Sequence, residues 1–235
     1  MRAVSALIFL LTLAPFSAAA EDYTGLFENA VQRVTWQYPE NWAFTEKRQG
    51  KESVKVGRFD PSKPEGHRWR LLSVDGRNPT EDEAEKYREE KSGERGFLGG
   101  DDDNGEEDEG PAAVVRPGSL ELVEESDSHW LLGFIPTGDD EDEEKFMRKM
   151  AGTVRIAKAG GHLEYLDISS EKPVRPAMGV KIRDFNTRFE FAEAVDGGPI
   201  VPVAFRFRIE GRAFLAVGFD EMETLEFSDF EPVSD

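Results

Sequence analysis

Three histidines, His67, His129 and His162, are the residues of this chain best suited to acid–base or metal chemistry, and they lie in separate segments. None has a second histidine or a cysteine at the short spacing of transition-metal ligands, so the sequence predicts no such metal site. The chain contains no cysteine, which excludes disulfides, thiol nucleophiles and cysteine-ligated metals.

The residue types of a hydrolase triad occur at His162, Asp167 and Ser169. Alternate residues of one strand cannot meet as nucleophile and base, so we interpret this set as coincidence. The sequence also lacks the G-x-S-x-G turn, the P-loop and the G-x-G-x-x-G fingerprint. Carboxylates are too numerous for spacing to single out a glycosidase-type pair. We therefore expect no enzyme, no catalytic residues and no cofactor.

The strongest structural signal is an alternation of apolar and polar side chains after residue 152. Within 185–193 the phenylalanines alternate with polar residues, and within 200–210 valine and phenylalanine alternate with arginine and glutamate. This period predicts antiparallel strands with one apolar and one solvated face. Further strands are expected over 33–38, 54–59, 68–74, 119–125, 129–135, 153–157, 162–168, 176–183, 212–219 and 224–230. A bulge or burial on both faces is expected in 163–168, and tight turns at 196–198 and at Glu210-Gly211.

Helices are expected over 22–32, 81–91 and 139–150. Thr80 and Glu83 form a capping-box pattern at the start of the second helix. The third carries Phe146 and Met150 on its apolar side, and is either a lid over the sheet or an ordinary packing helix. In the sheet, Arg206 and Arg208 are expected on the polar face, paired across strands with Glu190.

The chain has a net charge of −19, which excludes a nucleic-acid partner and disfavours an anionic membrane surface. Its acidity is concentrated: residues 81–109 contain 14 acidic and 4 basic residues. The low-complexity part of that stretch predicts a disordered acidic insertion at about 93–112. It does not fit an EF-hand, although loose calcium binding by its carboxylates stays an alternative.

Residues 1–20 have the pattern of a cleavable signal peptide. Arg2 precedes the apolar run 4–14, and Ala18-Ala19-Ala20 precede the acidic Glu21. We expect export to the periplasm or secretion, with residues 21–235 forming a single β-rich domain that has no later transmembrane segment.

Two phrases suggest a relationship: Phe59 to Tyr87, which contains WRLLSVDGRNPTEDE, and the closing FSDFEPV at Phe227 to Val233. Together they resemble uncharacterised exported bacterial proteins whose strand order is similar to the lipoprotein-carrier (LolA-like) fold. The resemblance implies an α+β fold, mainly antiparallel β, in which a curved many-stranded half-barrel sheet and covering helices enclose an apolar cavity. Carriers of that fold hold lipidated clients.

The expected function is therefore non-catalytic binding of a hydrophobic or lipid-like ligand or client. The alternative is a protein-interaction or envelope-sensor module with a self-filled core, whose acidic loops face a basic partner. The residues expected to line the cavity are large apolar side chains of two strands and the third helix: Phe185, Phe189, Phe191, Val203, Phe205, Phe207, Ile209, Phe146 and Met150.

Overall fold

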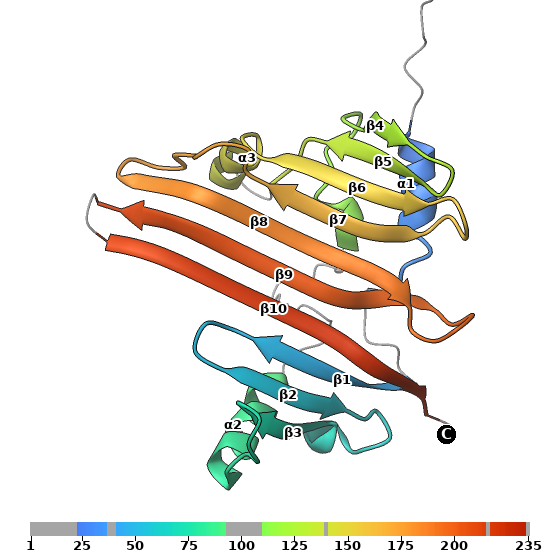
Figure 1. The fold of residues 1–235 in the computed structure, drawn as a ribbon, viewed down its shortest axis with the longest axis vertical. Coiled ribbons are helices and arrows are strands. Elements are labelled where there is room, and N and C mark those ends of the chain that lie inside the picture. Colours follow the sequence, from blue (N-terminus) through green and yellow to red (C-terminus); the bar gives the residue numbers. More distant parts are fainter. Residues whose placement is uncertain (1–22, 37–40, 93–109, 139–140, 215–216, 234–235) are drawn as a thin grey trace, which may run out of the picture.

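The computed structural model describes residues 23–36, 41–92, 110–138, 141–214 and 217–233. These residues form one open ten-stranded sheet in which every pair of neighbouring strands is antiparallel (Figure 1). The strand order is β3-β2-β1-β10-β9-β8-β7-β6-β5-β4, so β3 and β4 are the two edges. The expected α+β, mainly antiparallel fold is confirmed at this level.

The strands are β1 (Trp42–Gln49), β2 (Val54–Phe59), β3 (Trp69–Val74), β4 (Glu121–Glu125), β5 (His129–Phe134), β6 (Ala151–Ala157), β7 (Leu163–Ser169), β8 (Val180–Glu193), β9 (Ile200–Ala213) and β10 (Val217–Pro232). The last three are the longest and form the middle of the sheet (Figure 1).

The described helices are α1 (Thr24–Val31), α2 (Glu81–Ser92) and α3 (Glu141–Met147), with short 3₁₀ turns η1 (Glu65–His67) and η2 (Gly110–Ala112). The predicted capping box of α2 is confirmed, because the Glu83 amide donates to Thr80 Oγ1 and the Thr80 amide donates to a Glu83 carboxylate oxygen. The helices lie near the two ends of the sheet, α1 and α3 toward β4–β8 and α2 beside β3 (Figure 1).

The strand register places the large apolar side chains on one face of the sheet. One row of directly paired residues, which we call the central row, crosses all the strands: Leu122, Leu132, Val154, Leu166, Phe189, Phe205, Leu225, Arg48, Lys55 and Val74. Paired residues project to the same face, so the row shows that β4 to β10 present apolar side chains together.

The core on this face consists of two clusters. The large cluster joins α1 and Met150 to β5–β8 through residues such as Phe27, Leu132 and Phe185. The small cluster joins Tyr87 of α2 to β1–β3 and β10 through residues such as Phe44 and Leu225.

Three predictions about strands were wrong. Residues 33–36 form only an isolated bridge from Val34 to Ile200, while β1 begins at Trp42, where no strand is predicted. The segments 176–183 and 185–193 are one strand, β8, which starts at Val180 and has a register shift between Ile182 and Asp184.

The third error concerns Glu210-Gly211, predicted as a tight turn. Strand β9 continues through both residues to Ala213, so the strands predicted at 212–219 and 224–230 are instead the end of β9 and the single strand β10. A Cβ atom at Gly211 would lie 2.3 Å from Cζ of Phe219, so this glycine makes room for an aromatic ring. The predicted turn at 196–198 and the bulge in 163–168 are confirmed by a left-handed Gly197 and by the register shift opposite Arg155 and Ile156.

Two predictions fall largely outside the described residues. The signal peptide, 1–20, lies there, as does the acidic insertion up to residue 109. The end of the predicted insertion, residues 110–112, forms the 3₁₀ turn η2.

Candidate ligand-binding surface

The predicted cavity-lining residues lie on the apolar face but differ in burial. Phe185, Phe191 and Met150 are buried in the large cluster, with exposed fractions of 7%, 4% and 6%. The other candidates are half-buried. Phe146, Phe189, Phe207 and Ile209 pack against the large cluster, whereas Val203 and Phe205 pack against the small one.

The two clusters meet at Phe189 and Phe205, whose ring centroids are 4.9 Å apart. We call the half-buried residues along this junction the seam: Phe189, Val203, Phe205, Phe207 and Ile209. These residues come from β8 and β9, which pair with each other in the middle of the sheet. The pairing brings the two alternating segments together in one surface. The seam therefore retains accessible aromatic area on the apolar face.

Trp36 borders the seam. Its ring packs edge-on against Phe189 and Phe191, at centroid distances of 5.8 and 5.2 Å. The indole Nε1 is buried, lies against Gly110, and has no hydrogen-bond acceptor in the described part of the chain. Buried donors are nearly always paired, so this N–H stands out as a donor without a partner among the described residues.

Helix α3 is fixed beside the seam by Glu144. Its carboxylate accepts from Arg116 at 2.5 Å, from Arg148 at 2.9 Å and from the Gly138 amide at 3.1 Å. These bonds, that from Arg116 first, lower the pKa of Glu144 to about 2. The helix thereby holds Phe146 against Phe185, with ring centroids 5.5 Å apart.

A charged group lies on the same face beyond the seam and was not predicted. Glu46 and Lys91 are both buried, and Lys91 Nζ lies 2.8 Å from Glu46 Oε2. Lys91 Nζ also lies 4.7 Å from the centroid of the Trp69 ring. Arg48, the first polar member of the central row, lies 3.8 Å from Glu46 and 3.6 Å from Glu223. The sequence does not predict this group, because the largely polar β1 lacks the alternation typical of a strand.

The opposite face is polar. The predicted pairing of Arg206 with Glu190 is confirmed at 2.5 Å, and Glu190 also pairs with Arg188 at 2.9 Å. Arg208 pairs with Asp184 and Glu210 and not with Glu190, because it lies one register step further along β9.

His129 is the one histidine whose surroundings suggest a catalytic group. Its Nδ1 lies 2.9 Å from Ser126 Oγ, and its Nε2 lies 3.8 Å from Glu124. Ser126 Oγ, however, accepts from the backbone amides of Ser128 and His129 in the exposed β4–β5 turn. The hydroxyl is thus occupied in shaping the turn.

Within the described ranges, no group of three or more histidine or acidic side chains could hold a metal ion. None of the helices described here is long and apolar enough to cross a membrane. No protein-family model matches the chain, and comparison with curated proteins finds no significantly similar sequence.

Proposed function

We propose that this protein is an exported, non-catalytic binding protein that holds a hydrophobic or lipid-like ligand against the seam, on the plan of a lipoprotein-carrier (LolA-like) half-barrel. The observation that carries the proposal is the contact of Phe189 with Phe205, which joins two core clusters through side chains that are themselves only half-buried.

Area burial supplies the driving force. Each aromatic side chain of the seam that leaves water contributes about 25 cal/mol per Å² of apolar area. The indole N–H of Trp36, which has no acceptor among the described residues, offers a donor at the border of this surface. An amphiphile with a carbonyl or carboxylate oxygen would satisfy it, and ligand sites commonly combine an apolar wall with a few polar groups.

The test begins with the ligand. The protein is purified from its native host and extracted into organic solvent, and the extract is analysed by mass spectrometry, while the delipidated protein is titrated with a fluorescent fatty acid. A bound amphiphile and saturable uptake are expected. An empty protein that also takes up no probe would refute the proposal.

Two variants locate the site. Phe205→Gln places an amide in the seam and should weaken uptake about tenfold or more, since it removes most of one aromatic contact surface. Met222→Gln removes an apolar side chain from the opposite face of β10, where Met222 pairs with Arg208, and should bind as the wild type does. Equal binding by the two variants would place the ligand elsewhere.

A further inference from the structure

The ends of β8 and β9 farthest from the 194–199 turn bring two cations into direct opposition. Lys181 is the cross-strand partner of Arg212, so their side chains leave the same face of the sheet next to each other. Like charges in this relationship destabilise a sheet, unless an anion lies between them.

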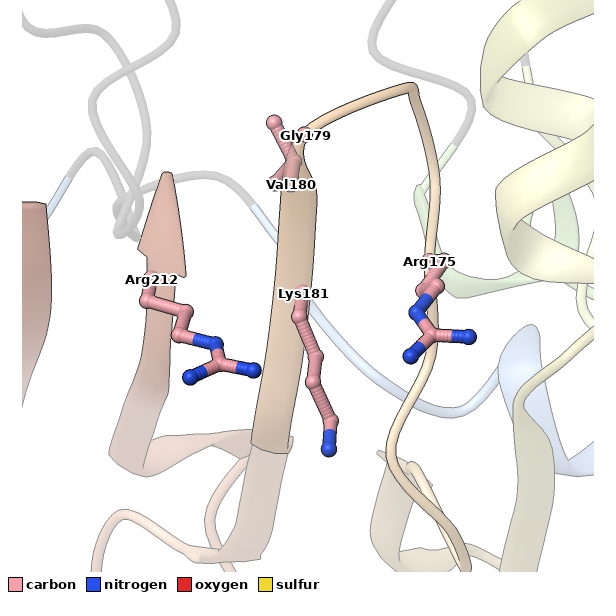
Figure 2. Close-up of a pocket in the computed structure, with 5 residues that line it drawn as sticks. All are labelled: Arg175, Gly179, Val180, Lys181 and Arg212. Atoms are coloured by element: carbon pink, nitrogen blue, oxygen red, sulfur yellow. The ribbon is translucent and has the colours of Figure 1, made fainter. Parts of the chain in front are cut away.

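A third cation joins them from a separate segment. Residue Val174 exchanges backbone hydrogen bonds of 2.8 and 2.9 Å with Ile182, which holds the segment before β8 alongside that strand. The next residue, Arg175, lines one small cavity of about 200 Å³ together with Gly179, Val180, Lys181 and Arg212. Figure 2 shows Arg175 and Arg212 on opposite sides of the strand that carries Lys181, with the Arg212 side chain extending toward that strand.

None of these three cations forms an ion pair with another residue that the structure describes. Glu210, two residues before Arg212 on β9, is already engaged by Arg183 at 3.2 Å and Arg208 at 3.6 Å. Arg188 and Arg206 are also directly opposed, but these two residues share the carboxylate of Glu190. Among the described residues, no carboxylate pairs with Lys181 or Arg212 in this way, although the net charge of the chain is −19.

We propose that the cavity formed by Arg175, Lys181 and Arg212 binds a phosphate group. A carboxylate is planar and offers only two acceptor oxygens, which one guanidinium fork can engage together. A phosphate monoester carries about −1.5 to −2 charges and three strongly accepting oxygens, which can be approached from three directions at once. Two guanidinium groups and an ammonium group from three segments match that demand. The volume suits a small group, because it is below the range typical of drug-sized ligands.

The neighbouring turns favour a phosphate with an apolar substituent. Met178 is 96% exposed and Phe214 is 76% exposed. The Phe214 amide donates to the Gly179 carbonyl at 2.7 Å, so both residues adjoin the cavity wall. The substituent can belong to a phospholipid or to a soluble ester, and the shared chemistry is the phosphate group.

The test uses residues 21–235, the whole chain that is expected after removal of the signal peptide. Binding of inorganic phosphate and of glycerol phosphate is measured by calorimetry, and binding of phosphatidylglycerol vesicles, with phosphatidylcholine vesicles for comparison, by sedimentation. The double variant K181Q/R212Q should lose about tenfold or more of its phosphate affinity, because hydrogen bonds to charged groups are lost. The variant R70Q/K172Q removes the same amount of charge from exposed positions outside the cavity and should bind as the wild type does.

Each outcome decides the proposal. Binding of the soluble phosphates that fails in K181Q/R212Q supports the site with a soluble ligand. Binding confined to phosphatidylglycerol vesicles and lost in the same variant supports it with a lipid headgroup. Absence of all binding, or equal loss in the two double variants, overturns it. The thermal midpoint of K181Q/R212Q in phosphate-free buffer should be unchanged or higher, which separates lost binding from lost folding.

Discussion

Glu46 of β1 and Lys91 of α2 form an ion pair that is almost completely removed from solvent, with side-chain exposures of 1% and 2%. Glu46 pairs with Gly57 on one side and with Phe227 on the other, so it projects into the apolar face. The pair ties the last turn of α2 to the sheet. Removing one partner of a buried pair costs about 3–5 kcal/mol, whereas replacing both by apolar groups is often neutral.

Lys91→Met should therefore lower the free energy of unfolding by about 3–5 kcal/mol, and E46L/K91M should recover most of that loss. Urea denaturation gives both values. Lys86→Met is the matched control, because the Lys86 side chain on the same helix is 77% exposed and should change stability by about 1 kcal/mol or less. A double variant as unstable as Lys91→Met would show that the pair is not what holds the helix.

Helix α2 also requires a glycine at position 57, because its Tyr87 ring leaves no space there for a side chain. A Cβ atom there would lie 2.1 Å from Oη and 2.7 Å from Cζ of Tyr87, a residue only 2% exposed. Gly57→Ala should destabilise the protein by about 1–3 kcal/mol through overpacking. Gly50→Ala has open space around its Cβ position and serves as the control.

The Gly57 clash can be tested by a double-variant cycle measured by thermal unfolding. Tyr87→Leu removes the ring that the new methyl group meets, so G57A/Y87L should be less destabilised than the two single changes added together. Strict additivity would mean that the cost of Gly57→Ala arises in the strand itself and not at the α2 contact.

The Glu190 carboxylate forms ion pairs with both Arg188 and Arg206 and so offsets the repulsion between these two residues on the polar face. With Glu190→Gln the two opposed guanidinium groups lose their shared anion, and stability should fall by about 1 kcal/mol. Arg206→Gln in the same background should restore part of the loss. Because these groups are partly exposed, about 0.5 M salt should reduce the difference between Glu190→Gln and wild type. A difference that does not respond to salt would point to lost packing instead.

The sequence predicted the sheet best where alternation is strict. Phe185 and Phe189 were placed correctly on one face because each strand position is fixed by period 2. Gly211 was misassigned, since a glycine that accommodates a neighbouring ring looks like a turn glycine in sequence. The seam required pairing information: Phe189 and Phe205 are 16 positions apart in the chain, and only the register joins them.

The two clusters of charged side chains could not be predicted from the sequence. Glu46 has no apolar alternation around it that would mark a buried face, because the polar run TEKRQ covers most of β1. The burial of Glu46 depends on its ion pair with Lys91 of α2, a helix whose own sequence is almost wholly polar. Similarly, Arg175, Lys181 and Arg212 come together only through the β8–β9 register and the Val174–Ile182 bridge.

The lowered pKa of Glu144 predicts how the stability of the protein changes at low pH. Its pKa in the folded protein is about 2, below the ordinary value of 4.5, because Arg116, the Gly138 amide and Arg148 all favour the carboxylate. A lowered folded pKa means that the contribution to stability is present above the unfolded value and is lost as pH falls from about 4.5 to about 2. Glu83, whose pKa is also lowered to about 2 by Arg77 and the Thr80 amide, contributes in the same window.

Glu144→Gln should thus have a lower thermal midpoint than the wild type at about pH 7, and the gap should close as pH approaches about 2. Calorimetric scans across this range measure it. Glu141→Gln, on the same helix with a side chain 86% exposed, is the control and should follow the wild type throughout. When Glu144 of the wild type is protonated at low pH, it loses the same charge interactions that Glu144→Gln lacks, and this part of the difference in thermal midpoint disappears. A difference that stays constant with pH would therefore mean that the substitution acts through packing of α3.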